Sequence, residues 1–288
     1  MKYLMNINYT IRHFFAQQFT LWRLLLLLLC APSLSYATHI VGGEVGYRCL
    51  GNDRYEITVR VYRDCAPSTE PFDRVASVGI FDRNGLLLQD VRINATSATP
   101  LDNNLDACIQ ATTKVCVETM TYKATVSLPF RVGGYQIVYQ RCCRNRTILN
   151  IVNPLETGAT YDIWLTEAAM RRCNNSATFR RWPDIYICNN RPLDFDHSAI
   201  DVDGDSLVYR LCTPMQGATF AKPQPQPPNF PPFDTLLWLK PLYNLQNMLG
   251  LGEPLRINSQ SGLLTARPGL LGQFVIGICV DEYDRTTK

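Results

Sequence analysis

Apolar and polar side chains alternate along most of this chain with a period of two residues, which is the period of a β-strand. The run 55–62 shows the pattern clearly, because it places Tyr55, Ile57, Val59 and Val61 on one face. Similar runs predict strands at 78–81, 86–93, 115–128, 135–141, 159–166, 185–188, 207–211, 255–257, 262–265 and 274–280. Helical periodicity is almost absent, with room for a turn or two at 165–172. The pattern predicts an all-β fold of antiparallel β-sandwiches.

Turn residues divide the chain into segments. Asn84-Gly85 lies between two strand-like runs and predicts a β-hairpin, and Gly133-Gly134 predicts a second one. Turn residues also collect at 189–192, where we place a boundary between two tandem modules. The N-terminal module spans 38–189 and the C-terminal module 190–288. Inside the second, the proline-rich segment 222–232 predicts extended polyproline II on the surface, as a stiff connector or a docking ligand.

The first 37 residues are typical of an export signal. Basic residues precede an unbroken apolar run at 24–29, and Ser35-Tyr36-Ala37 offers small residues to a signal peptidase that cleaves after Ala37. The apolar run is shorter than the roughly 20 residues that span a bilayer. The alternatives are a retained anchor or a lipid anchor at Cys30.

Removal of the signal changes the charge balance. It takes away three of the 28 Lys and Arg residues and none of the 25 Asp and Glu residues, which leaves 25 of each. A near-neutral chain without a basic stripe argues against nucleic acid as a partner.

Ten cysteines remain in the mature chain, and an even number in an exported chain predicts a disulfide framework. They are Cys49, Cys65, Cys108, Cys116, Cys142, Cys143, Cys173, Cys188, Cys212 and Cys279. A zinc site is disfavoured because no paired CxxC motif is present and the mature chain has only two histidines, His39 and His197.

The expected pairings follow from strand geometry. Cys212 and Cys279 lie on neighbouring predicted strands, so we expect them to bond to each other outside the core. Cys142 and Cys143 are adjacent and point to opposite faces of a strand, so we expect two different partners for them. Further candidate pairs, which spacing alone does not fix, are Cys108–Cys116 and Cys173–Cys188.

An acidic turn stands directly before the strand predicted at 207–211. Asp201, Asp203 and Asp205, with Gly204 between the last two, offer several hard oxygen ligands of the kind that Ca²⁺ prefers. The spacing does not match an EF-hand loop, because Ser206 stands where that loop needs glycine. More carboxylates belong to the same module, at Asp194, Asp196, Asp281, Glu282 and Asp284. The alternative is a solvated turn whose aspartates accept hydrogen bonds from nearby backbone N–H groups.

Motifs for catalysis are weak. The mature chain begins near Ile40-Val-Gly-Gly43 as trypsin-like proteases do, but it lacks their serine context and has His197 only nine residues before Ser206. No phosphate-binding loop or HExxH motif occurs. A pair of carboxylates could hydrolyse glycosides, with Glu118, Glu167 and Glu282 as the candidates. We therefore expect no catalytic residues and keep a hydrolase as the alternative.

The chain contains four further motifs: Thr38-His-Ile-Val-Gly-Gly-Glu44, Tyr62-Arg-Asp-Cys65, Cys116-Val-Glu118 and the run from Gly134 to Asn145. Together they resemble the N-terminal region of large Bacteroidota surface proteins. The C-terminal module resembles cadherin-like and immunoglobulin-like (Ig-like) domains, in the runs 201–209, 258–265 and 272–278. Proteins of this kind often carry PKD or other Ig-like repeats and end in gliding-motility-associated sorting domains for type IX secretion. Such a domain is not found before Lys288, so we expect a piece of a longer protein.

The resemblance implies two tandem Ig-like or cadherin-like β-sandwiches exported to the extracellular space or the outer cell surface. We expect a non-enzymatic role in adhesion or ligand display, with a surface protein or a glycan as partner and with calcium as the candidate cofactor. Contact with a membrane would come only through export or a sorting domain. The alternatives are the N-terminal part of a secreted glycan-directed hydrolase and a structural spacer for a further C-terminal domain.

Overall fold

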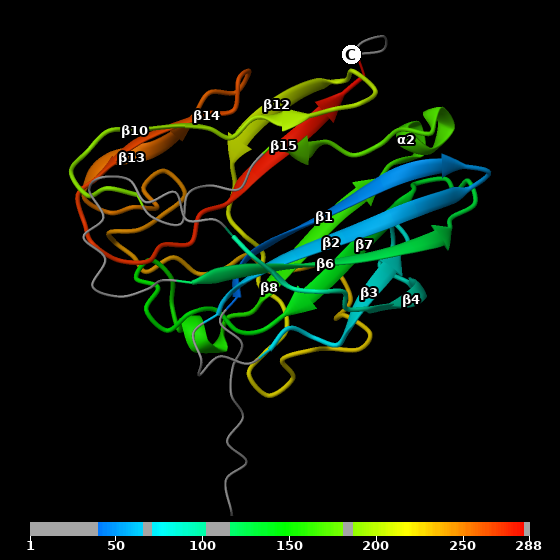
Figure 1. Ribbon diagram of the computed structural model, residues 1–288, viewed down its shortest axis with the longest axis horizontal. Helices are drawn as coiled ribbons and strands as arrows, with labels where there is room; N and C mark the ends of the chain where they lie inside the picture. The colour runs from blue at the N-terminus through cyan, green and yellow to red at the C-terminus, as the bar shows by residue number, and fades with distance from the viewer. Residues whose placement is uncertain (1–39, 66–70, 102–115, 181–186, 285–288) are drawn as a thin grey trace, which may run out of the picture. The chain divides into compact units, whose positions relative to one another are not determined.

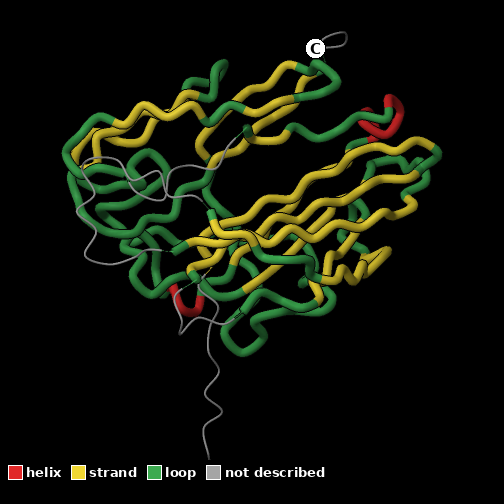
Figure 2. Tube along the Cα trace, in the orientation of Figure 1, coloured by secondary structure: helices red, strands yellow, loops and turns green. Residues whose placement is uncertain are grey.

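The computed structural model describes residues 40–65, 71–101, 116–180 and 187–284. Ala37–Lys288 form one compact unit. The fold is all-β, as predicted, and the helical segments described are the short 3-10 helix η1 (Pro154–Glu156) and α2 (Glu167–Arg172) (Figure 2). Among the described residues, no helix is long and apolar enough to cross a membrane. The predicted signal peptide and Cys108 lie outside the described residues.

Two four-stranded antiparallel sheets contain the first eight strands (Figure 1). The first sheet has the order β1-β2-β6-β5, with β1 (Ile40–Gly51), β2 (Arg54–Asp64), β5 (Thr99–Pro100) and β6 (Val117–Ser127). The second has the order β4-β3-β7-β8, with β3 (Val75–Phe81), β4 (Leu87–Asn94), β7 (Tyr135–Arg141) and β8 (Ala159–Leu165). Both sheets contribute to one large buried core, which includes Ile57 and Tyr122 from the first and Ile80 and Ile137 from the second.

The remaining strands form three small antiparallel sheets. Their members are β10 (Leu193–Asp196), β14 (Leu263–Pro268) and β13 (Gly252–Ile257); β9 (Thr178–Phe179) and β11 (Ala199–Ile200); and β12 (Ser206–Leu211) and β15 (Ile278–Tyr283). A second, smaller core lies on the three-stranded sheet around Phe195, Leu255 and Leu264. The predicted strand at 274–280 begins only at Ile278, and 187–188 are not in a strand.

The two predicted hairpins have different outcomes. The Asn84-Gly85 turn joins β3 to its antiparallel neighbour β4, as predicted, and Gly85 has a positive φ of 81° that favours glycine. The prediction of a hairpin at Gly133-Gly134 was wrong. Its flanking strands β6 and β7 belong to different sheets, because β6 pairs with β2 while β7 pairs with β3 and β8. The turn therefore carries the chain from one sheet to the other.

The proline-rich segment 222–232 packs on the second sheet. The backbone N–H of Cys142 donates to the carbonyl of Pro223 over 2.9 Å, and the N–H of Asn229 donates to Oε1 of Gln140 over 2.8 Å. Phe230 meets Phe81 edge-on, with ring centroids 5.9 Å apart. These contacts explain why β3 and β7 are buried at almost every position, whereas a strand exposed on one face would alternate. The segment therefore covers β3 and β7. It also lies on the surface, as the sequence predicted, because Lys222, Gln226, Asn229, Phe230 and Pro232 are exposed.

Segments from both sides of residue 190 also meet at a buried asparagine. The side chain of Asn150 is fully buried, and its Nδ2 donates to the carbonyls of Met248 and Val275 over 3.0 and 2.7 Å. Its Oδ1 accepts from the N–H of Val275 over 2.9 Å. The predicted module boundary at residue 190 stays a prediction, and any division there must account for this shared junction.

Four disulfides join described cysteines: Cys49–Cys173, Cys65–Cys116, Cys142–Cys143 and Cys212–Cys279. The predicted Cys212–Cys279 bond is present, and Cys188 is also disulfide-bonded. The predicted Cys108–Cys116 and Cys173–Cys188 pairings were wrong. Pairing of β2 with β6 brings Cys65 to Cys116, and the end of α2 brings Cys173 to Cys49. The separate partners expected for Cys142 and Cys143 were also wrong, because a cis peptide joins these residues and they bond to each other.

Arg144 is a buried cation just beyond this vicinal disulfide. It is 5% exposed, its Nε has no hydrogen-bond partner, and it forms no ion pair with a described residue. Burial lowers the pKa of the Arg144 guanidinium. A buried charge without a counter-ion costs free energy that an apolar side chain of similar size does not.

We expect Arg144→Met to raise the free energy of unfolding by about 1–2 kcal/mol. The measurement is urea unfolding followed by tryptophan fluorescence. The matched control is Arg141→Met, which should lose about 3 kcal/mol because it removes the partner of the buried Asp73, 2.9 Å away. If Arg144→Met loses as much stability as the control, Arg144 has a compensating partner and our account is wrong.

Candidate functional site

The acidic turn connects β11 to β12 and is closed by its own hydrogen bond. The N–H of Asp205 donates to Oδ1 of Asp201 over 2.8 Å. Gly204 has a positive φ of 81°, which glycine adopts without strain, so it allows the chain to turn back into β12. Ser206 pairs with Tyr283 at this end of the β12–β15 ladder. The antiparallel register therefore brings Glu282 of β15 beside the turn.

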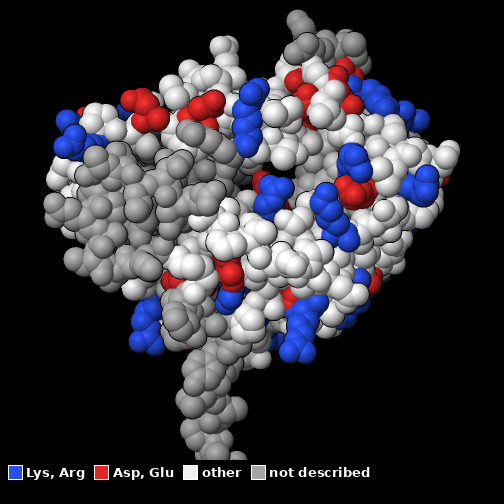
Figure 3. All heavy atoms as spheres, viewed as in Figure 1, with Lys and Arg blue, Asp and Glu red and all other residues white. Residues whose placement is uncertain are grey.

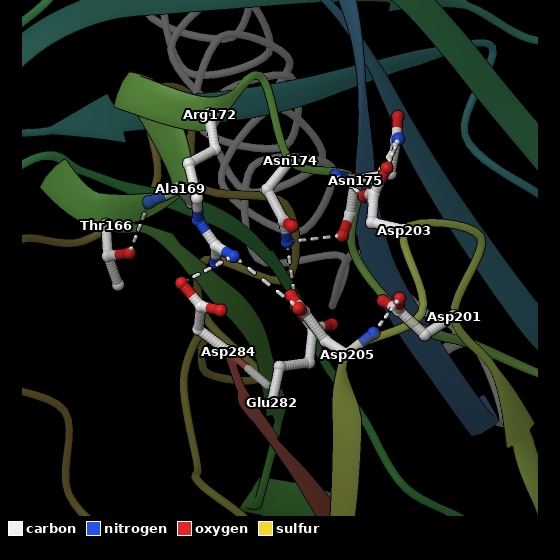
Figure 4. A network of polar contacts seen from close by, with 10 residues as sticks. All are labelled: Thr166, Ala169, Arg172, Asn174, Asn175, Asp201, Asp203, Asp205, Glu282 and Asp284. Carbon is white, nitrogen blue, oxygen red and sulfur yellow. Dashed lines mark hydrogen bonds and ion pairs between the residues drawn. The ribbon is translucent and has the colours of Figure 1, made fainter. Parts of the chain in front are cut away.

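Three carboxylates converge at this point (Figure 4). Asp201, Asp205 and Glu282 each offer one oxygen, and these oxygens all lie within 4.8 Å of one another. Oxygens that share one Ca²⁺, each about 2.4 Å from the ion, are at most about 5 Å apart. An all-oxygen set without cysteine or histidine suits hard cations such as Ca²⁺. The cluster thus has the chemistry and the spacing of a partial calcium shell.

Asp203 takes a different position from the one that the sequence suggests. Its carboxylate accepts from the backbone N–H of Asn175 over 2.6 Å and from Nδ2 of Asn175 over 3.0 Å. Asp203 is therefore not one of the three converging carboxylates. Its place is taken by Glu282, which the sequence analysis had named only among the further carboxylates of the module. Asp194 and Asp196 lie on β10 in another sheet, and Oδ1 of Asp196 accepts from the N–H of Ser198.

Negative charge dominates the surroundings of the cluster. Burial raises the pKa of Glu282 to about 7, and the carboxylates of Asp201, Asp205 and Asp203 add to the rise. Oδ2 of Asp201 is buried and has no hydrogen-bond partner among the described residues. A buried polar atom in this state costs about 1–3 kcal/mol. A cation at the cluster would offset both the repulsion and the missing partner.

Arg172 supplies positive charge from the last turn of α2. Its guanidinium lies 2.8 Å from Asp284 and 3.5 Å from Asp205. Within the described residues, Arg172 pairs with Asp284 and with one of the three converging carboxylates, Asp205, so it neutralises only part of the cluster's charge when the carboxylates are ionised. The residual negative charge remains available to a divalent ion.

A disulfide and a helix cap position these groups. Thr166 caps α2 by accepting from the N–H of Ala169 over 3.1 Å, and the Cys49–Cys173 bond ties the other end of the helix to β1. Asn174 and Asn175 follow directly. Nδ2 of Asn174 donates to Oε2 of Glu282 over 3.3 Å (Figure 4). The cluster is thereby held between β1, the end of α2 and the β12–β15 pair.

The hydrolase candidates do not gather in one place. Glu118 on β6 forms an ion pair with Arg63, and Glu167 on α2 forms one with Arg171 at 2.7 Å. The hydrogen bond from Arg171 lowers the pKa of Glu167. Glu282 belongs to the acidic cluster. Each of the three carboxylates is thus bound to a different set of neighbours.

The raised pKa of Glu282 predicts a stability that depends on pH. A free glutamate has a pKa near 4.5, so between about pH 4.5 and 7 the folded chain keeps a proton that the unfolded chain has lost. The free energy of unfolding should therefore fall as pH rises through this window. The fall is at most about 3 kcal/mol, and solvent screening of the partly exposed carboxyl makes it smaller.

The measurement is urea unfolding at pH 5 and pH 8 in the presence of EDTA. Other carboxyls titrate as well, so the readout is the difference between the parent chain and Glu282→Gln. This substitution should remove most of the fall. A fall of equal size in both proteins would assign the pH dependence to other groups.

Comparison with protein-family models, with curated proteins and with solved structures finds no match to this chain. The interpretation of the site therefore depends on its own residues.

Proposed function

We propose that this chain is an exported, non-enzymatic β-sandwich protein that binds calcium and acts in adhesion or ligand display at the outer surface of a cell. Asp201, Asp205 and Glu282 converge, and the buried Oδ2 of Asp201 has no hydrogen-bond partner in the described part of the chain; this is the observation that carries the calcium assignment. The other support comes from the disulfides and from the sheets.

The disulfides support export. Four bonds between described cysteines, together with the bonded Cys188, fit an oxidising compartment and are rare in the cytosol. The signal peptide proposed at 1–37, with cleavage after Ala37, gives the matching route out of the cytosol.

The sheets support a sandwich of the Ig-like type for the N-terminal part. Two four-stranded antiparallel sheets share one core, and their inward side chains alternate with outward ones along β2. The resemblance to Bacteroidota surface proteins of the type IX secretion and gliding-motility class is consistent with this architecture. We keep it as part of the proposal, together with the cadherin-like character of the C-terminal strands.

Calcium binding is tested by isothermal titration calorimetry on the full mature chain. We expect binding in the parent and at least a tenfold loss of affinity in Asp201→Asn, because this substitution removes a charged ligand from a set of three. The control is Asp194→Asn, an exposed aspartate on β10 that should leave the affinity unchanged. Equal affinities in all three proteins, or no binding to the parent, would contradict the assignment.

One observation favours the hydrolase as a second candidate. A carboxyl with a pKa near 7 beside other carboxylates is also the arrangement of a general acid in glycoside hydrolysis. Both oxygens of Glu282 accept hydrogen bonds, from Ala177 and Asn174, which favours the metal assignment over proton transfer. Release of sugars from polysaccharides by the parent, lost in Glu282→Gln, would support the hydrolase instead.

A further inference from the structure

A groove opens beside the acidic turn, on the outer face of the first sheet. It has a volume of about 490 Å³, within the range of ligand-binding clefts. Its floor is formed by β1, β2 and β6, and its opposite wall by the segment 175–178 with Ile200 and Val202. Figure 3 shows a hollow in this face with basic and acidic side chains near its rim.

The floor presents more positive than negative charge. Arg48, Arg60 and Lys123 line it together with two carboxylates, Glu44 and Glu56. Arg60 pairs with Glu44, while Glu56 is shared between Arg48 and Lys123, each 3.5 Å away. The side chains of Arg48 and Lys123 are 62% and 54% exposed. Such long and exposed ion pairs are weak, so both cations can bind a carboxylate of a ligand instead.

The opposite wall is apolar at its rim. The exposed Ile200 and Val202 face the groove, and they alternate with Asp201 and Asp203 along the turn. An extended peptide directs successive side chains to opposite sides. Acidic side chains could therefore reach the cations of the floor while the apolar side chains between them contact the wall.

The groove is less suited to other ligands. Among the described residues that line the groove, Tyr47 is the one aromatic residue, and its side chain is buried, so these residues offer no aromatic platform for a sugar ring. Strand addition to β1 is blocked at Tyr47, whose N–H donates to Oγ of Ser176 and whose carbonyl accepts from the N–H of Ser176. Recognition must therefore come from side chains.

We propose that this groove binds an extended peptide segment of a partner protein in which acidic and apolar residues alternate, and that calcium at the acidic turn strengthens this binding. The floor residues Glu44–Arg48 of β1 extend over about 13 Å, enough for four or five extended residues. Val202 lies between the carboxylate ligand Asp201 and Asp203, so an ion at the turn fixes the position of the wall. This second part depends on the proposed calcium site.

The probe is a fluorescein-labelled hexapeptide that alternates glutamate and valine, titrated with the full mature chain and followed by fluorescence anisotropy. We expect the double variant Arg48→Gln/Lys123→Gln to weaken binding at least tenfold, since each cation supplies a charge-assisted contact. The control is Arg256→Gln/Lys222→Gln, which removes two exposed cations outside the groove and should leave the affinity unchanged. A lysine–valine hexapeptide should not bind.

Equal binding of the two peptides, or equal affinity of the parent and the Arg48/Lys123 variant, would overturn the groove assignment. Binding of a sulfated oligosaccharide at the same residues in place of the acidic peptide would also overturn it. The proposal that calcium strengthens peptide binding is tested by measuring the affinity for the glutamate–valine peptide in 2 mM Ca²⁺ and in EDTA. If calorimetry detects calcium at the turn and the peptide affinity does not change, the coupling is wrong. If no calcium binds, the metal site fails, while the groove still depends on the Arg48/Lys123 result.

Discussion

Replacing Cys49 and Cys173 together by serine is expected to lower the free energy of unfolding by about 3–5 kcal/mol. The bond joins residues separated by 124 positions, so it removes a large amount of conformational freedom from the unfolded chain. It also ties the end of β1 to the end of α2, beside the segment that holds Asn174 and Asn175. The measurement is urea unfolding of oxidised protein at pH 7.

The same variant should bind calcium more weakly, because Arg172 and Asn174 lose their anchor to β1. The matched control is Cys65→Ser/Cys116→Ser, which opens a bond between residues 51 positions apart, at the ends of β2 and β6. We expect the control to lose stability but to keep its calcium affinity. A loss below about 1 kcal/mol for Cys49/Cys173, or the same fall in calcium affinity for both variants, would contradict this role.

Asp73→Ala is expected to cost about 3–5 kcal/mol. The Asp73 carboxylate is buried and accepts from Nε of Arg141 over 2.9 Å and from the hydroxyl of Tyr139 over 3.0 Å. Removing it leaves a guanidinium and a buried phenol without their partner. Burial raises the pKa of Asp73 even though Arg141 opposes the rise, so the ion pair does not fully offset the desolvation of its two members.

The double variant Asp73→Ala/Arg141→Met should therefore recover much of the loss, because it removes both charges. The surface control is Glu253→Ala, which breaks an exposed ion pair with Arg267 and should cost less than about 1 kcal/mol. Thermal unfolding of the parent, of Asp73→Ala, of Arg141→Met and of the double variant measures the coupling free energy between the two residues. If the losses of the two single changes simply add, Asp73 and Arg141 do not act as a pair.

Strand periodicity predicted the class of fold and most of the strands, because an alternating run such as 55–62 reports directly which face is buried. It could not predict how strands pair. Gly133-Gly134 has the composition of a hairpin turn, yet the choice of sheet for β6 and β7 depends on long-range contacts that no local pattern contains. The burial of both faces of β7 was likewise decided by 222–232, more than 80 positions later in the chain.

The sequence predicted the acidic turn but only part of its membership. Asp201 and Asp205 are two positions from Asp203 in the chain, and the turn sends Asp203 to Asn175 while β15 brings in Glu282. Glu282 takes this place because β12 pairs with β15 in a register that puts Leu207 opposite Glu282. This register is set by the pairing of two distant strands, and no local sequence pattern contains it. The groove left no signal in the sequence at all, because its floor and wall come from residues up to 158 positions apart, Glu44 and Val202.

Because 222–232 cover β3 and β7, the first half of the gene encodes strands that depend on a segment encoded in the second half. A gene fragment that ends near codon 190 would encode a sheet without this cover, which would expose the buried side chains of Phe81 and Val138 and take the Asn229 N–H away from Gln140. Newly exposed apolar side chains favour self-association. Shuffling of the first half alone into other genes would thus be selected against. The lineage of this protein should show the two halves transmitted together, as a single cassette.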